Sequence, residues 1–130
     1  HTRLLTVTGV QTCALPICVF ATRNAAHLAH WSARGVGSYA RHMALGDFYE
    51  GLLGKIDAIV EMYQGAFGLV ENIPATSALP SKIAEHIAEE AKWIQANRAA
   101  VADGVTAIEN AIDDLIGHYL TTYYKLANLT

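Results

Sequence analysis

The chain has 130 residues, of which 16% are charged and 52% belong to the hydrophobic types. This length suits one domain, and low charge with high apolar content excludes an intrinsically disordered tail. Nine Lys and Arg against twelve Asp and Glu give a net charge of −3, so the basic composition of a nucleic-acid-binding domain is missing. We therefore expect a single globular domain with no nucleic-acid partner.

The segment from Leu4 to Thr22 carries no charged residue, which invites a membrane-anchor interpretation. It contains too many polar and helix-breaking residues for a spanning helix, so we expect no membrane partner. Residues 7–17 instead resemble an in-frame translation of a sequencing-library adapter. We therefore treat residues 1–18 as a non-native or disordered segment and residues 19–130 as the folded domain.

Four segments have the three- or four-residue apolar spacing that is typical of amphipathic helices. The first covers residues 19–34 and ends at the breaker Gly35-Val36-Gly37. The second covers residues 38–67, with Ser38 as its predicted N-cap and Gly68 at its end. Its apolar stripe consists of Leu45, Tyr49, Leu52, Ile56, Ile59, Val60, Tyr63 and Phe67.

A loop over residues 69–80 separates this helix from the third, whose predicted N-cap is Ser81. Gly104 predicts the turn into the fourth helix. The stripe of the third helix is Ile83, Ile87, Ala91, Ile94, Arg98 and Val101, and that of the fourth is Val105, Ile108, Ile112, Leu115, Tyr119, Tyr123 and Leu126. Four such helices with one long connection between the second and the third predict an all-α, ferritin-like four-helix bundle.

Side chains that can bind a metal ion gather on one strip of the second helix and near the end of the first. On the second helix they fall within about 100° of one another, beside the apolar stripe. Imidazole together with carboxylate suits iron, manganese or zinc better than calcium. The alternative is a solvated face with ordinary surface histidines. The six candidate ligands are His27, His30, His42, Glu50, Asp57 and Glu61.

The spacing of these residues requires a second copy of the chain. His42 and Asp57 stand about 22 Å apart along one helix, so they cannot bind the same ion within one chain. An antiparallel copy crossing near Glu50 would bring His42 opposite Asp57, and Gly46 and Gly54 would permit close approach. The sequence therefore predicts a homodimer or larger homo-oligomer with the site at its twofold interface.

The run His30-Trp31, then His42, then Asp57 with Glu61, resembles the signature of the Dps-type mini-ferritins. The resemblance implies a twofold interface at which histidines of one subunit meet carboxylates of its mate. It also implies oxidation of ferrous iron by peroxide or oxygen and storage in a dodecameric shell. We expect iron as the bound metal, with manganese or zinc as alternatives.

One position departs from the mini-ferritin pattern. Gly46 stands where that family usually has an aspartate, four residues after the second histidine. Asp47 points about 100° away, and Glu50, one turn further along, is the better substitute. The departure removes a ligand for a second ion, so ferroxidase activity is left open.

Nearly all of residues 20–130 resemble a group of short, uncharacterised ferritin-like proteins of phages and bacteria. This resemblance implies the fold and the cytoplasm of a bacterial host, with virion association as an option, but no settled activity. The alternative function is therefore a metal-free, phage-associated helical module that assembles or binds a partner. The motifs that carry the resemblance are His27-Leu28-Ala29-His30-Trp31, Ser38-Tyr39-Ala40-Arg41-His42, Glu61-Met62-Tyr63-Gln64-Gly65 and Tyr124-Lys125-Leu126.

Two further groups of titratable residues have simpler interpretations. His86 with Glu89 and Glu90 predicts a solvated face of the third helix. Asp114 and His118, one turn apart on the fourth helix, predict an exposed ion pair. Neither group is expected to belong to the site.

Overall fold

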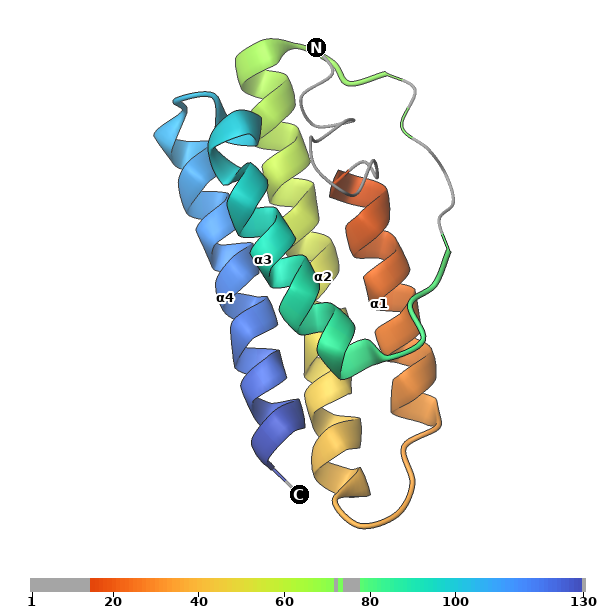
Figure 1. Cartoon of the computed structure of the whole chain (residues 1–130). Coiled ribbons are helices and arrows are strands. Elements are labelled where there is room, and N and C mark those ends of the chain that lie inside the picture. Colours follow the sequence, from red (N-terminus) through yellow and green to blue (C-terminus); the bar gives the residue numbers. More distant parts are fainter. Residues whose placement is uncertain (1–14, 72, 74–77, 130) are drawn as a thin grey trace.

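The computed structural model describes residues 15–71, 73 and 78–129. Within these residues the chain forms four helices and no strand: α1 (Leu15–Trp31), α2 (Ser38–Phe67), α3 (Ile83–Ala102) and α4 (Thr106–Asn128). The helices pack side by side as a bundle (Figure 1). The predicted all-α four-helix bundle is therefore confirmed.

The order of the helices around the bundle explains the long connection. α4 packs on both α2 and α3, while α1 packs on α2 and, through a smaller interface, on α3. α2 and α3 are therefore diagonal to each other, and both run away from the end that holds the α1–α2 turn (Figure 1). Because these diagonal helices are parallel, the connection between them has to return along the length of the bundle. Its described residues 78–82 lie beside α1 (Figure 1).

The predicted bounds of α2 are correct, but its cap is not. Gly37, with a φ of 78°, occupies the N-cap position, Ser38 is the first helical residue, and no side chain caps the helix. Gly68 ends the helix as predicted, with a φ of 101°, and its N–H donates to the carbonyl of Gln64. The predicted cap of α3 is also wrong, since Lys82 rather than Ser81 precedes its first turn.

α1 begins earlier than its apolar spacing predicts. It starts at Leu15 rather than Val19 and ends at Trp31 rather than Arg34, and the residues from Leu15 to Cys18 are helical and buried. Pro16 fits the first turn, where a helix needs no N–H donor. The expected boundary at residue 18 thus falls inside α1, whereas residues 1–14 lie outside the described part of the chain. None of the described helices, α1 included, combines the length and apolar character needed to cross a membrane.

The core lies along the bundle axis and is built of aliphatic side chains with three large rings, Phe48, Tyr63 and Tyr119. The predicted stripes are correct at most positions and drift at others. On α4 the buried residue after Tyr119 is Thr122, whereas Tyr123 is exposed. The buried positions 108, 112, 115, 119 and 122 are spaced alternately by four and three residues, as in a heptad pattern. The predicted stripe left this spacing at Tyr123 because position 122 holds a polar threonine.

Candidate functional site

Two histidines close the α1–α2 hairpin and hold each other's backbone. The rings of His30 and His42 stack, with centroids 3.6 Å apart and an interplanar angle of 19°. Nδ1 of His30 is 2.7 Å from the carbonyl oxygen of His42, and Nδ1 of His42 is 2.9 Å from that of His30. A carbonyl oxygen can only accept, so each Nδ1 carries the proton. In the neutral rings Nε2 therefore keeps its lone pair, the arrangement typical of metal-ligating histidines.

Gly46 makes room for one of these rings. A Cβ atom at position 46 would lie 3.1 Å from Cε1 and 3.3 Å from Nδ1 of His30. The aspartate of the mini-ferritin pattern would therefore crowd the stacked imidazoles. Gly46 is covered by His30 of its own chain instead of being left open for a second copy. At Gly54, by contrast, an added Cβ would meet no atom of the described chain within 4 Å, so this position stays open.

Aromatic rings surround the third histidine of this region. His27 stacks on Tyr49 with centroids 4.0 Å apart and contacts Trp31 at 4.3 Å. Tyr49 in turn meets the ring of His30 edge-on at 5.3 Å, and the guanidinium of Arg23 lies 5.7 Å from its centroid. The His27 ring is thus packed between two aromatic rings, 6.3 Å from that of His30.

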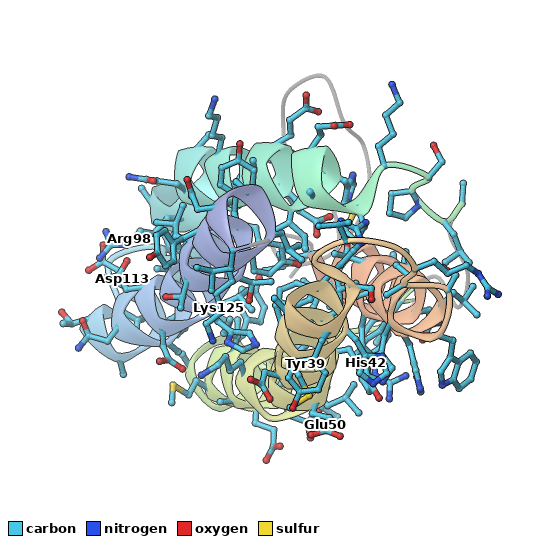
Figure 2. All side chains as sticks on the ribbon, turned by 90° about the horizontal axis from the view of Figure 1, so that it is seen from below. Tyr39, His42, Glu50, Arg98, Asp113 and Lys125 are labelled. Atoms are coloured by element: carbon cyan, nitrogen blue, oxygen red, sulfur yellow. The ribbon has the colours of Figure 1, made fainter. Side chains whose placement is uncertain are left out.

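The three candidate carboxylates lie on the surface of α2. Glu50, Asp57 and Glu61 are all exposed, and Figure 2 shows Glu50 on the same outer side of the bundle as His42. Within the described residues no group of three His, Cys, Asp or Glu side chains is close enough to hold a metal ion. One chain therefore brings His30 and His42 together but leaves Asp57 and Glu61 away from them. The dimer hypothesis takes these carboxylates from a second copy.

A buried carboxylate forms a second polar centre, which the sequence pattern did not predict. Glu90 is only 2% exposed, so its assignment to a solvated face is wrong. Its Oε2 accepts hydrogen bonds from the hydroxyl of Thr22 at 2.5 Å and from that of Tyr119 at 2.6 Å. Residue 90 lies three after Ile87 and four before Ile94, and this spacing is the signal that could have placed it in the core.

His86 completes this cluster and connects it to the surface. Its Nε2 is 3.0 Å from Thr22 Oγ1 and 3.3 Å from Glu90 Oε1. Because the Thr22 hydroxyl donates its only hydrogen to Glu90, it accepts from His86, whose proton is therefore on Nε2. One side of His86 lines an open cleft of about 450 Å³ at the start of α3. The cluster thus joins α1, α3 and α4 around one carboxylate whose oxygens are all paired.

Burial and a neighbouring charge make Tyr119 a weaker acid than an ordinary tyrosine. Its hydroxyl is enclosed in the core, and desolvation, followed by the charge of Glu90 and the hydrogen bond to it, raises the pKa of Tyr119 well above the ordinary value of 10.0. The phenol therefore stays protonated and acts as a hydrogen-bond donor over the physiological range.

The predicted ion pair between Asp114 and His118 is not formed. Asp114 pairs with Lys55 of α2 at 2.8 Å. His118 instead places Nε2 2.9 Å from the carbonyl oxygen of Phe48, directly above Gly51, where a Cβ would lie 2.8 Å from the imidazole. His118 and His30 therefore share one arrangement: each imidazole donates a hydrogen bond to a backbone carbonyl of α2 and packs against a glycine of that helix.

Arg98, predicted as part of an apolar stripe, forms a surface ion pair. Its Nε and Nη2 donate to the two carboxylate oxygens of Asp113 at 2.6 and 2.8 Å, on the side of the bundle away from His42 (Figure 2). The hydrogen bonds from Arg98 lower the pKa of Asp113, and the same contact raises the pKa of Arg98. This pair fastens α3 to α4 on the surface.

The fold and these contacts define a small four-helix-bundle protein with paired histidines at one end and a buried carboxylate at its centre. The chain belongs to the family of unknown function DUF5856, whose profile matches residues 30–126. The matched segment begins at His30 and so includes both stacked histidines, the exposed acids of α2 and Glu90. No curated protein and no solved structure matches the sequence at a significant level.

Proposed function

We propose that this protein is a ferritin-like homo-oligomer that binds iron, or a similar divalent ion, between two copies. His30 and His42 of one copy would supply imidazole nitrogens, and Asp57 and Glu61 of the second would supply carboxylates. The observation that carries the proposal is the pair of Nδ1–H donors fixed on backbone carbonyls, which leaves Nε2 of both rings for coordination. Glu50 and His27 are the remaining candidates nearby.

Two features support this assignment. A four-helix bundle with one long crossover connection is the arrangement of ferritin-like folds. Imidazole and carboxylate ligands in one set suit iron, manganese and zinc. Iron at such a site would supply one-electron redox chemistry, and the mini-ferritin resemblance points to oxidation of the ferrous ion. The cytoplasm of a bacterial host is the compartment that goes with this function.

Metal-dependent stabilisation tests the proposal. Anaerobic ferrous iron or zinc, at a hundredfold excess over its Kd, should stabilise the protein by about 2.7 kcal/mol and raise its Tm. In His42→Asn the amide nitrogen replaces Nδ1 but nothing replaces Nε2, so this variant should keep the fold and lose the shift. Asp57→Ala should also lose it, whereas Asp47→Ala, at an exposed acid outside the proposed set, should keep it.

The oligomer gives a second measurement. Sedimentation velocity should show a dimer or larger species in the presence of metal, and mixing His42→Asn with Asp57→Ala should restore one intact site per mixed dimer. The proposal is overturned if the wild-type Tm does not respond to metal, or if the protein binds metal as a monomer.

A metal-free module that assembles or binds a partner, including a phage-associated one, is the second candidate. The observation that favours it is the reciprocal hydrogen bonding of His30 and His42, which by itself closes the α1–α2 hairpin. Under this function metal would change neither the oligomer size nor the Tm, in wild type or in His42→Asn.

A further inference from the structure

The charges of this protein are distributed unevenly along the chain and therefore in space. All twelve acidic residues lie between Asp47 and Asp114. The acid-free segments comprise α1, the α1–α2 turn and the start of α2, together with the last part of α4, and they meet at one end of the bundle (Figure 1). α3, which carries several acids, begins short of this end (Figure 1). The end is therefore cationic although the whole chain is negative.

We define the hairpin end by the residues Trp31, Arg34, Val36, Tyr39 and Arg41. Neither arginine makes an ion pair or a side-chain hydrogen bond with another residue of the described chain. Lys125, near the end of α4, adds a third cation on this side of the molecule (Figure 2). The cations are thus available to an outside anionic partner.

Three large apolar side chains of the hairpin end are exposed. Val36 is 100% exposed between Gly35 and Gly37, whose φ angles of 87° and 78° form the turn that presents it. Trp31 and Tyr39 flank it and are 67% and 75% exposed. Their rings combine an apolar body with a polar tip, the character of side chains that settle at a membrane–water interface.

We propose that the hairpin end docks on the surface of an anionic lipid membrane. Val36, Trp31 and Tyr39 would enter the interfacial layer, and the arginines would contact the lipid phosphates. A nucleic-acid partner fits this surface less well than a membrane does. Nucleic-acid binding relies on many contacts between cations and phosphates, and an exposed valine adds nothing to them. A symmetric contact between two copies would set unpaired arginines against each other.

This docking differs from the expectation of no membrane partner, which rested on the lack of a spanning segment. A peripheral contact needs no such segment, only exposed apolar side chains beside cations. The proposed metal site lies next to this surface, because His30 and His42 adjoin Trp31 and Arg41 in the chain. The two proposals are therefore tested apart, with metal removed when docking is measured.

Vesicle binding in the presence of a metal chelator tests the proposal. The protein should co-sediment with phosphatidylcholine vesicles that contain phosphatidylglycerol, and at least about tenfold more weakly with phosphatidylcholine alone. High salt should release it. Tryptophan emission should shift to the blue as Trp31 leaves water.

Variants locate the contact. Val36→Asp, and Arg34→Glu combined with Arg41→Glu, should each weaken binding to the anionic vesicles at least about tenfold. Leu69→Asp is the matched control, since Leu69 is 77% exposed and lies just beyond α2 at its other end. Circular dichroism should be unchanged in all three, because none of the substituted side chains is buried.

Four results would overturn the proposal. They are no binding to anionic vesicles, equal binding to neutral ones, equal loss in Leu69→Asp, and full binding by Val36→Asp. A lipid-free dimer that Val36→Asp dissociates would assign the hairpin end to a second copy instead. Displacement from vesicles by duplex DNA, with DNA binding lost on the arginine reversals, would assign it to nucleic acid.

Discussion

The hydroxyl of Tyr119 donates a 2.6 Å hydrogen bond to Oε2 of Glu90 and so joins α4 to α3 at the centre of the bundle. The same oxygen accepts from Thr22 of α1, so one carboxylate holds three helices in register. This contact is the main polar feature of a core that is otherwise largely apolar, and it should govern how the protein responds to substitution at Glu90 and to alkaline pH.

Replacing Glu90 by methionine should lower the free energy of unfolding by about 2–5 kcal/mol, because two buried hydroxyls lose their acceptor. Glu90→Gln, which keeps an acceptor oxygen, should cost about 1 kcal/mol. Glu89→Gln, on the exposed side of α3, should stay within about 0.5 kcal/mol of wild type. Urea denaturation measures all three. A neutral or stabilising Glu90→Met would show that desolvation of the carboxylate outweighs its hydrogen bonds.

Tyr119 should make the protein sensitive to alkali. Its folded pKa is raised by burial and then by Glu90, whereas an unfolded tyrosine titrates near 10. The stability that this group contributes is therefore fully present below about pH 10 and is lost as the pH rises above it. The free energy of unfolding above about pH 10 should fall more steeply in wild type than in Tyr119→Phe. Equal slopes would contradict the prediction.

Two glycines of α2 should respond differently to alanine. At Gly54 no atom of the described residues lies within 4 Å of the added Cβ, so Gly54→Ala should stabilise the helix by roughly 0.5–1 kcal/mol. At Gly51 the Cβ would come within 2.8 Å of the imidazole of His118 and push it from its hydrogen bond to Phe48, which should offset that gain. In a His118→Ala background Gly51→Ala should become stabilising. Thermal denaturation of the four variants gives the comparison, and a Gly51→Ala as stable as Gly54→Ala would contradict it.

The Arg98–Asp113 pair should contribute to the acid response of the protein. Hydrogen bonds from Arg98 lower the folded pKa of Asp113 below its ordinary value of 3.8. Its stabilising effect is therefore present above that value and is lost as the pH falls through the folded pKa. Asp113→Asn should flatten the acid limb of the stability curve. Carboxyl titration by NMR would detect the shift directly, and a normal pKa for Asp113 would contradict the assignment.

The elements of the fold that depend on local pattern were predictable. The apolar spacing of α2 and the glycine after it predict its bounds correctly, and the proline-rich connection predicts the break before α3. Caps were not predictable in this way, because Gly37 and Lys82 take the N-cap positions without any side-chain hydrogen bond. The start of α1 at Leu15 depends on packing against the other helices and not on spacing alone.

At the candidate site, the placement of His30 beside His42 follows from their positions on either side of a short turn. The burial of Glu90 could not be predicted in this way, because a charged side chain predicts a solvated face. Its burial is possible because three hydrogen-bond partners from three helices surround the carboxylate. The need for glycine at positions 46 and 51 could not be predicted from neighbouring residues either, because each glycine makes room for a histidine ring from another helix.

Periodic apolar residues and their breakers thus determined, within the chain itself, that four helices form and roughly where each one lies. Which polar groups became buried, which glycines were needed and which end of the molecule gathered the cations were decided only when the helices packed. The reason is that a helix period is a property of neighbouring residues, whereas the free energy of a carboxylate or an imidazole depends on atoms that distant segments bring to it.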